Sequence, residues 1–559
     1  MKLTSFLYLQ LLFLVAFTIM PMPKQFEKGE KTVKIQQRCA IKFSSQQEFP
    51  DHIMQLLRHY HELMTLNSNC QFEESLKKQN LQIEGSLKLN INLQSDEQLY
   101  WVNDTKQEAY TVEIDEKLNV IINAPNHWAL ARAIDTVHQL TENNEVENLP
   151  LKIYDEPAFA YRGVMVDTAR HFLPLKILER TIDALVINKM NVLHWHITDD
   201  ESFPLLLTNY SQITNTSKHW ETAYFTKSDV SYIIEYASIR GVQIIPEIDS
   251  PAHAQSWGRS SDLAEMIITC GSTIKQYGQF DPTLDLTYEV LKSVMQDLND
   301  MFAKVQFIHF GGDEASNSCF DQRPSIKQFM VDHGIATYFD LQVYYRQRQK
   351  DIWKNQIKST KRIAYWYNKN DQLPAEDDDI IHWWGLTSQL VDVKNRTNDF
   401  ILSDYHPLYL DVGVGNAFGN SYDAYQTWKD FYKWSPSPPE GFKGNIIGGE
   451  APLWGETNNQ NTHFQKMFLR SSILGDTLWN PNSKQTEQFW QFTQRLSEME
   501  DRMNKYGFPV SPFTHDYCKR HTKLCFPTLY GNDQNNQDVP ESQSESESQS
   551  NIILQSQSE

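Results

Sequence analysis

The feature that most restricts the fold is a repeat: between Tyr161 and Tyr506 the chain alternates short apolar runs with segments that have the spacing of helices. The strand candidates are 163–170, 191–200, 241–249, 305–314, 361–368, 379–384, 400–405 and 445–456. Helical patterns such as 174–190, 228–240 and 286–304 lie between them. Eight strand–helix repeats predict an α/β fold in which parallel strands close into a (β/α)8 TIM barrel.

An open, doubly wound sheet is the alternative arrangement of the same repeat. It would gather functional residues at the one point where the strand order reverses. In this sequence, polar and aromatic residues follow nearly all of the strand candidates, and a barrel brings all strand ends to one mouth. The barrel is therefore the favoured prediction.

At 559 residues the chain is long enough for more than one domain. Residues 23–155 combine alternating segments, such as 87–94, 109–114 and 118–124, with one helical run at 128–140, which predicts a smaller α+β domain. The barrel, with a C-terminal helix and extension, is expected over 156–527. Residues 528–559 are rich in Ser, Gln and Glu and too polar to pack, so we expect a disordered tail.

Residues 1–22 predict a signal peptide, because one Lys is followed by an apolar run of secretory length. A membrane anchor is the alternative, although Gln10 shortens the run below the ~20 apolar residues that a span needs. Six cysteines fall into local pairs, for which we predict disulfides: Cys39 with Cys70, Cys270 with Cys319, and Cys518 with Cys525. N-glycosylation is expected at the sequons of Asn103, Asn209, Asn215 and Asn395. A secreted or lysosomal protein is the resulting expectation.

The formal net charge of −20 argues against nucleic acid, or stable association with an anionic membrane, because both partners are themselves negative. None of the cysteines has the C-x-x-C spacing of a zinc or redox site. We therefore predict no metal and no cofactor. Small neutral molecules remain as the substrate class.

Acidic, basic and aromatic residues gather at the ends of the strand candidates: Asp167, Arg170, Asp199, Asp200, Glu247, Asp249, His253, Asp313, Glu314, Trp366, Trp384, Trp454 and Glu456. Taken singly, such residues are usually helix caps or core packing. Together at one barrel mouth they suit a neutral sugar, whose hydroxyls bind carboxylates and whose apolar ring faces pack on indoles. The pattern predicts a carbohydrate-active site.

Five motifs, in order along the chain, carry a resemblance to a known family: YRGVMVDTARHFLP (161–174), NKMNVLHWHITDD (188–200), PEIDSPAHAQSWG (246–258), HFGGDE (309–314) and GGEAPLWGE (448–456). The sequence resembles the β-N-acetylhexosaminidases of glycoside hydrolase family 20, which include lysosomal hexosaminidases. The resemblance covers most of the chain, from the α+β domain to the last cysteine pair. It implies hydrolysis of terminal N-acetyl-β-D-hexosamine residues from glycoconjugates or chitooligosaccharides.

The resemblance also implies roles for individual residues. Glu314 would be the general acid/base, Asp313 would orient the 2-acetamido group, and Asp199 and His253 would form a relay with Glu314. Substrate contacts would come from Arg170, Asp411 and Glu456 to sugar hydroxyls, from Tyr409 to the acetamido carbonyl, and from Trp366, Trp384 and Trp454 around the N-acetyl group. Related enzymes are often dimers, so a homodimer is expected. Where family members that accept sulfated sugars carry a positive residue, this chain has Asp411 and Val412, which implies a preference for neutral sugars.

The adjacent carboxylates Asp313 and Glu314 agree with this mechanism on physical grounds. Successive side chains of a strand point to opposite faces, so neighbours do not readily flank one glycosidic bond as separate acid and nucleophile. In a retaining, substrate-assisted reaction the acetamide oxygen is the nucleophile and forms an oxazolinium intermediate, so the two carboxylates can have different tasks. We expect Gly311 and Gly312 to provide the backbone angles that turn both towards the pocket, and the charge of Asp313 to raise the pKa of Glu314.

Two alternatives remain. His194 and His196 lie on one strand face with the spacing of metal ligands, which would suit a metal-dependent hydrolase built on the same barrel. The simpler interpretation is that they hold neighbouring loops. A catalytically silent carbohydrate-binding protein would keep the pocket without a working acid. Loss of activity on chelation would support the metal site, and sugar binding without turnover would support the binding protein.

Overall fold

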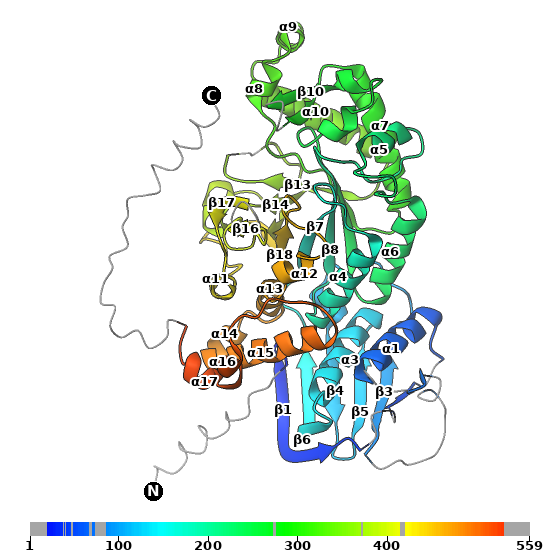
Figure 1. Cartoon of the computed structure of the whole chain (residues 1–559), viewed down its shortest axis with the longest axis vertical. Coiled ribbons are helices and arrows are strands. Elements are labelled where there is room, and N and C mark those ends of the chain that lie inside the picture. The colour runs from blue at the N-terminus through cyan, green and yellow to red at the C-terminus, as the bar shows by residue number, and fades with distance from the viewer. Residues whose placement is uncertain are drawn as a thin grey trace, which may run out of the picture.

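The computed structural model describes residues 19–36, 39, 41–45, 48–65, 70–72, 76, 85–271, 276–370, 373–413 and 420–529. A sheet domain formed by the N-terminal part of the chain lies at the bottom of Figure 1, and the barrel lies above it. Residues 1–18 of the predicted leader and residues 530–559 of the predicted tail are outside the described residues. Within the described ranges, no helix is both long and apolar enough to cross a membrane.

The N-terminal domain is built on a six-stranded sheet in the order β1 (Gln25–Lys34), β6 (Glu145–Asp155), β4 (Tyr110–Ile114), β5 (Asn119–Ala124), β3 (Leu87–Leu93) and β2 (Ile41–Ser44). Alternate residues of β4 are buried, because one face of the sheet packs against α3 (His127–Thr141), beside which α1 (Asp51–Met64) lies. The strands predicted at 87–94, 109–114 and 118–124 and the helix at 128–140 are confirmed. The other strands and α1 were not predicted.

Eight parallel strands close the barrel in the order β7 (Tyr161–Asp167), β8 (Val192–Thr198), β9 (Gln243–Ile248), β12 (Phe307–His309), β13 (Arg362–Tyr367), β14 (Ile380–Trp383), β15 (Asp399–Leu402) and β18 (Asn445–Leu453). Each predicted barrel strand is present, so the prediction of a TIM barrel preceded by a smaller α+β domain is confirmed. All residues of β7, β8 and β9 are buried, as in parallel sheets that are covered on both faces.

Helices lie outside the barrel strands, among them α4 (Leu175–Ile187), α5 (Ser211–Ser217), α6 (Lys227–Ile239), α7 (Asp285–Met301), α10 (Tyr338–Asp351), α12 (His463–Met467) and α13 (Arg470–Trp479). The helices predicted at 174–190, 228–240 and 286–304 correspond to α4, α6 and α7 and are confirmed. The predicted C-terminal helix is α15 (Phe489–Lys505), and α16 (Asp516–Arg520) and α17 (Thr522–Cys525) follow it. Figure 1 shows these last helices at the lower left, beside the sheet domain.

Two long loops project beyond the barrel and form the upper tip of the molecule in Figure 1. The loop after β9 holds the hairpin of β10 (Ile267–Gly271) and β11 (Gln276–Phe280), and the loop after β12 holds α8 (Asn317–Phe320) and α9 (Pro324–His333). A disulfide between Cys270 and Cys319, whose Cα atoms are 5.7 Å apart, joins the two loops. The other predicted disulfides, Cys39–Cys70 and Cys518–Cys525, are also formed. The same two loops carry His253 and Glu314 of the predicted relay, whereas Asp199 lies in the loop after β8.

A buried ion-pair group connects the two domains. Glu108 Oε1, in the 3-10 helix η1 (Thr105–Glu108), lies 3.0 Å from Arg132 Nε on α3 and 2.8 Å from Arg162 Nη2 on β7, and all of these side chains are fully buried. Each guanidinium thus finds the partner that a buried charge needs. The barrel and the sheet domain are therefore held in a defined orientation.

The last residues of the predicted leader belong to the folded structure. Ile19 and Met20 are buried, and the backbone N–H of Met20 donates a hydrogen bond of 3.0 Å to Gln139 Oε1 on α3. Arg495 on α15 donates to the carbonyl oxygen of Ile19, at 3.3 Å. Cleavage of the chain after residue 22 would remove these contacts.

Candidate active site

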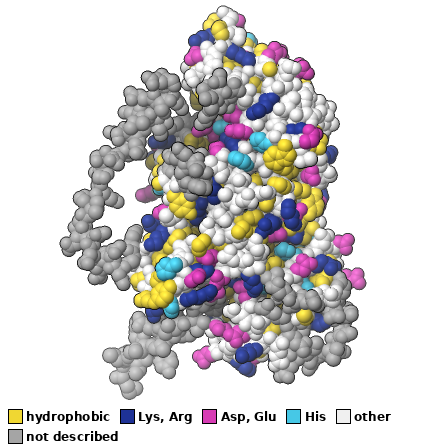
Figure 2. Space-filling view, viewed as in Figure 1, with side chains coloured by type: hydrophobic (Ala, Val, Ile, Leu, Met, Phe, Trp, Pro, Cys, Tyr) yellow, Lys and Arg dark blue, Asp and Glu magenta, His cyan; other side chains and the backbone are white. Residues whose placement is uncertain are grey.

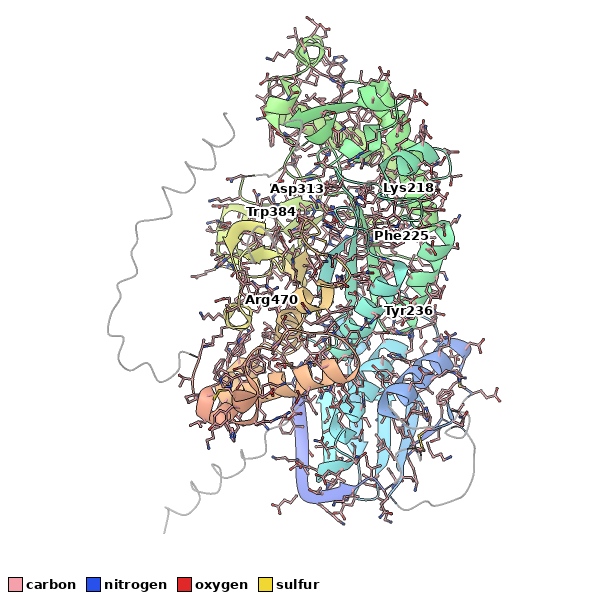
Figure 3. The ribbon with its side chains drawn as sticks, in the orientation of Figure 1. Lys218, Phe225, Tyr236, Asp313, Trp384 and Arg470 are labelled. Atoms are coloured by element: carbon pink, nitrogen blue, oxygen red, sulfur yellow. A yellow bond between two sulfur atoms is a disulfide. The ribbon has the colours of Figure 1, made fainter. Side chains whose placement is uncertain are left out.

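The barrel strands all run in the same direction, which places the predicted site at one end of the barrel. Figure 3 labels Asp313 and Trp384 at this end, and Figure 2 shows acidic and histidine side chains gathered in the same part of the surface. Because the strands are parallel, the loops that follow them all meet at this mouth. The site is therefore built from residues that are far apart in the sequence.

Two glycines turn the chain sharply between β12 and the carboxylate pair. Gly311 has φ of +60° and Gly312 has φ of +95°, both in the region that favours glycine. A Cβ atom on Gly311 would lie 1.7 Å from Asp249 Oδ1, so only glycine fits there. The backbone N–H of Gly312 donates to the same carboxylate oxygen at 2.9 Å. This geometry supports the expectation that the glycines direct Asp313 and Glu314 towards the pocket.

The predicted relay residues Asp199, His253 and Glu314 lie in a row in space at the mouth of the barrel. His253 Nδ1 is 3.2 Å from Asp199 Oδ1, and His253 Nε2 is 3.4 Å from Glu314 Oε2. His253 has φ of +54° and Glu314 has φ of +55°, so both occupy a backbone conformation that costs energy for a residue with a side chain. Such strain is often found at functional sites. The structure thus brings all three residues together.

Charges in the relay determine its ionisation. The hydrogen bond and the charge of His253 hold the pKa of Glu314 below its ordinary value, which is the opposite of the direction expected from Asp313 alone. Burial would lower the pKa of His253, but Asp199 and Glu314 outweigh it and raise that pKa well above its ordinary value. The prediction failed because it considered only the neighbour in sequence, whereas His253 comes from another loop.

The surroundings of Asp313 differ from those of Glu314. The side chain of Glu314 is 62% exposed, whereas Asp313 is half-buried near Asp249 and Tyr409. Burial and the charge of Asp313 raise the pKa of Asp249 well above its ordinary value, so Asp249 is a neutral neighbour. One carboxylate faces solvent and the other faces the pocket wall, which suits two separate tasks.

Arg170 lies among several carboxylates at the end of β7. Its Nη1 atom is 3.0 Å from Asp167 Oδ2 and 2.8 Å from Asp199 Oδ2, and its Nε atom is 3.4 Å from Glu201 Oε2. The guanidinium carbon lies 5.2 Å from the ring centroid of Trp454. Burial and the charge of Asp199 raise the pKa of Glu201 to about 7. Burial would lower the pKa of Arg170, but Asp199 and Asp167 raise it well above its ordinary value, so Arg170 stays charged at the mouth.

Aromatic side chains form one wall of the site. The ring centroids of Trp366 and Trp454 are 5.8 Å apart, and those of Tyr409 and Trp454 are 6.2 Å apart. The indole N–H of Trp366 donates to Glu247 Oε1 at 2.6 Å. Trp384 follows β14 at the same end of the barrel and is half-buried, but it has no ring contact with the other three in the described part of the chain. The structure thus groups Trp366, Trp454 and Tyr409 closely.

The two remaining predicted substrate residues lie near the same wall. Asp411 is fully buried and its charge helps to raise the pKa of Tyr409, after burial and the charge of Asp313. Glu456 is exposed in the loop after β18. Lys466 on α12, which sequence reasoning missed, is near both acids, whose charges act to raise its pKa against the effect of burial. Its Nζ donates to the carbonyl oxygen of Thr457 at 2.8 Å. Two acids and one lysine therefore lie in the part of the site that is expected to bind sugar hydroxyls.

Below the mouth, the barrel interior contains imidazoles paired with carboxylates. His196 Nδ1 is 2.7 Å from Glu247 Oε2, and its Nε2 is 2.9 Å from Asp199 Oδ2. His194 Nδ1 is 2.8 Å from Glu450 Oε1. Several of these groups are close enough to share a metal ion, but most of their ligand atoms already face one another as ion pairs. This arrangement favours the interpretation that His194 and His196 hold neighbouring elements.

Sequence reasoning gave no site role to Glu247 or Glu450. The sequence marks Glu247 only as a strand-end acid, and Glu450 lies within β18, where an acid in an otherwise apolar strand is the one available signal. All four sequon asparagines, Asn103, Asn209, Asn215 and Asn395, are exposed on the surface. The four sites are thus accessible to glycosylation.

Comparison with known proteins agrees with this site. The model of the catalytic domain of glycosyl hydrolase family 20 matches residues 159–482. The beta-hexosaminidase subunit beta of Homo sapiens is 32% identical over 441 residues, which cover 77% of this chain and 76% of that protein. The chitooligosaccharidolytic beta-N-acetylglucosaminidase of Ostrinia furnacalis is 27% identical over 476 residues, covering 77% of this chain and 78% of that protein.

Solved structures show the same fold. The family 20 exo β-N-acetylglucosaminidase of Vibrio harveyi in complex with N-acetylglucosamine superposes with a TM-score of 0.74 at 21% identity, over 90% of this chain and 79% of that chain. The chitobiase of Flavobacterium johnsoniae gives a TM-score of 0.72 at 22% identity, over 88% of this chain and 73% of that chain. From the family match and the identity to the human relative, we conclude that the chain belongs to glycosyl hydrolase family 20.

Proposed function

We propose that the protein is a β-N-acetylhexosaminidase that removes terminal, non-reducing N-acetyl-β-D-glucosamine or N-acetyl-β-D-galactosamine residues from glycoconjugates or chitooligosaccharides. The observation that carries this proposal is the arrangement of Asp199, His253 and Glu314 beside Asp313 at the barrel mouth. Family membership and the names of the relatives support the same activity. The aromatic wall of Trp366, Trp454 and Tyr409 supports binding of a sugar with an apolar acetamido methyl group.

In the proposed reaction, Glu314 donates a proton to the glycosidic oxygen while the acetamide oxygen of the substrate attacks the anomeric carbon. The leaving group departs and an oxazolinium ion forms, with its positive charge stabilised by Asp313. Glu314, now a carboxylate, accepts a proton from water as that water attacks the anomeric carbon. The acetamide is released, and the product retains its configuration because the anomeric carbon has been attacked twice from opposite faces.

Other residues would prepare these steps. His253, held by Asp199, stabilises the carboxylate of Glu314 between its two proton transfers. Arg170, Asp411 and Glu456 would bind ring hydroxyls, and Tyr409 would donate to the acetamido oxygen. These contacts fix the sugar so that its own acetamide lies below the anomeric carbon.

The proposal is tested by turnover of chromogenic N-acetylglucosaminide, N-acetylgalactosaminide and glucoside substrates with the purified protein. We expect cleavage of the two N-acetyl sugars and almost none of the glucoside, because a 2-hydroxyl group does not form the cyclic intermediate. Equal turnover of the glucoside would contradict the mechanism. Binding of N-acetyl sugars without any turnover would favour the carbohydrate-binding alternative.

The cellular setting is part of the proposal. Disulfides and exposed sequons support a secreted or lysosomal enzyme. We propose a homodimer because related enzymes are often dimers, and a reaction without a cofactor because the substrate's own acetamide is the nucleophile. Because Ile19 and Met20 are buried, we place removal of the leader before Ile19 rather than after residue 22. Gel filtration would test the dimer, and N-terminal sequencing of the mature protein would test the cleavage position.

A further inference from the structure

A continuous chain of alternating carboxylates and imidazoles runs from the barrel interior to the mouth. Its members, in order, are Glu450, His194, Glu247, His196, Asp199, His253 and Glu314. The successive separations between their nearest oxygen and nitrogen atoms are 2.8, 3.1, 2.7, 2.9, 3.2 and 3.4 Å. They come from β18, β8 and β9 and from the loops after β8, β9 and β12. The relay at the mouth is thus the outer end of a longer structure.

Each imidazole in this chain has a carboxylate oxygen within 3.4 Å of both ring nitrogens, although His194 Nε2 forms no hydrogen bond with Glu247. A carboxylate is an acceptor only, so a nitrogen that faces it must carry a proton to bond with it. His196 is the clearest case, because it hydrogen-bonds on one side to Glu247 and on the other to Asp199. An imidazole that donates from both nitrogens is an imidazolium ion. The hydrogen bonds therefore favour positive charge at His196, and the carboxylates on both sides of His194 and His253 favour positive charge there as well.

The charges of the neighbouring groups agree with this assignment. Burial would lower the pKa of His194, but Glu450 and Glu247 raise it to about 9, and Glu247 and Asp199 raise the pKa of His196 well above its ordinary value. Three imidazolium ions then balance the carboxylates of Glu450, Glu247 and Asp199. The carboxylate left over is that of Glu314, at the outer end.

We propose that His196 and Glu247 are positioning residues for the reaction, and that this interior chain sets the protonation of the catalytic acid. Glu247 fixes His196, His196 fixes Asp199 and supplies positive charge, and Asp199 orients His253 towards Glu314. Glu247 also accepts the indole N–H of Trp366, so the same residue aligns the aromatic wall. The inference rests on the proposed role of Glu314 as the acid.

Other groups touch the chain from the surrounding strands. His309 Nδ1 lies 3.0 Å from Glu247 Oε1, and His382 Nε2 lies 3.7 Å from Glu450 Oε1, but burial lowers the pKa of both imidazoles, so they are neutral. The hydroxyl of Tyr161 donates to Glu450. Near the mouth, the remaining neighbours are Arg170 beside Asp199 and His253, Asp167 near His196, Asp200 and Asp249 near His253, and Asp313 beside Glu314. Among the residues that the structure describes, none of these groups lies between His196 and its two carboxylate partners, Glu247 and Asp199.

The test is the pH profile of kcat/KM in the variant His196→Gln, which can still donate a hydrogen bond to Asp199 but carries no charge. The falling limb at high pH reports loss of the proton from the acid of the free enzyme. Removing a nearby positive charge raises the pKa of Glu314, so this limb should move to higher pH by about half a unit or more. A falling limb at the wild-type pH, in a variant that folds, would overturn the inference.

The matched control is His382→Gln. His382 is equally buried in the barrel and stacks on Trp366 with 3.9 Å between ring centroids, but it is neutral and outside the chain. We expect its falling limb to stay at the wild-type pH, whatever the variant does to the rate. A third variant, Glu314→Gln, tests the role of Glu314 separately from the role of the interior residues. If Glu314→Gln keeps full activity, the proposed function of Glu314 is wrong. If the falling limb of His382→Gln shifts as far as that of His196→Gln, only the proposed role of the carboxylate–imidazole chain is contradicted.

A measurement on the unmodified enzyme covers the case in which His196→Gln does not fold. Nitrogen NMR of protein labelled only at histidine distinguishes imidazolium from neutral rings. At pH 8 an ordinary histidine, with a pKa of about 6.5, is almost entirely neutral. We expect imidazolium signals from His194, His196 and His253 to persist at this pH. A spectrum at pH 8 without any imidazolium signal would refute the charge alternation.

Discussion

Replacing Gly311 with alanine should damage catalysis far more than it damages the fold. A left-handed backbone costs a residue with a side chain about 1–2 kcal/mol, and Gly311 has φ of +60°. In addition, the new Cβ would lie 1.7 Å from Asp249 Oδ1, so Asp249 must move and its hydrogen bond from the Gly312 N–H is lost. Leaving that buried N–H without its partner costs about 1–3 kcal/mol more. The total is about 2–5 kcal/mol.

Gly334 provides a control that isolates the close contact. It ends α9 with φ of +65°, yet a Cβ atom there would meet nothing within 4 Å. Gly334→Ala should therefore lower the free energy of unfolding only by the backbone term of about 1–2 kcal/mol. The comparison of the two variants leaves the displacement of Asp249 as the difference between them.

The assay is thermal unfolding together with kcat on a chromogenic N-acetylglucosaminide. Asp313 and Glu314 directly follow the glycine pair, and a displacement of about 1 Å at a reacting group can cost on the order of 10²-fold in rate. We expect Gly311→Ala to lose at least that much activity and to melt below Gly334→Ala, which should keep nearly the wild-type kcat. If both variants had the same melting temperature and the same kcat, the close approach of Gly311 to Asp249 would have no role in placing the carboxylates.

Four further predictions follow from the site. Glu314→Gln should lose about 10²–10⁴-fold in turnover and be partly rescued by aryl sugars with very good leaving groups, whereas Asp313→Asn should not be rescued; a sugar trapped covalently on either carboxylate would refute the substrate-assisted mechanism. Because His253 holds the pKa of Glu314 below its ordinary value, the proton needed for catalysis is lost as pH rises in the acid range, so kcat/KM should fall there and a profile still rising above neutral pH would contradict this role. A 6-sulfated N-acetylglucosaminide should be cleaved much more slowly than the unsulfated sugar because Asp411 would repel the sulfate, and equal rates would refute this. Finally, deleting residues 19–22 from the mature protein should lower its melting temperature, since Ile19 and Met20 are buried, and an unchanged temperature would show that the leader can end at residue 22.

The pKa of Glu314 is shifted in the opposite direction to the one that the sequence predicts. From the sequence, the nearest charge to Glu314 is its neighbour Asp313, and that charge predicts a raised pKa. In the structure, His253 lies 3.4 Å away and lowers the pKa instead. A contact between loops of different strands decides the sign, and no local pattern reports such a contact.

The barrel itself could be predicted from the sequence, because period and length of the apolar runs are local properties of buried parallel strands and their helices. The mouth residues could also be predicted, since the end of each strand marks the position from which a side chain reaches the site. Local spacing was sufficient for the disulfides as well: Cys518 and Cys525, for example, are only 7 residues apart.

The pairing of the buried charged residues depends on how the barrel closes. Glu450 and His194 are 256 residues apart in the chain and become hydrogen-bond partners only because β18, β7 and β8 are neighbours around the ring. The same closure brings His196, from β8, against Glu247, from β9, and so creates buried charges that stabilise one another where a single one would be costly. Residue types and their order along the strands are local information, whereas the partner of each buried charge depends on which strands meet, and that is a property of the folded barrel alone.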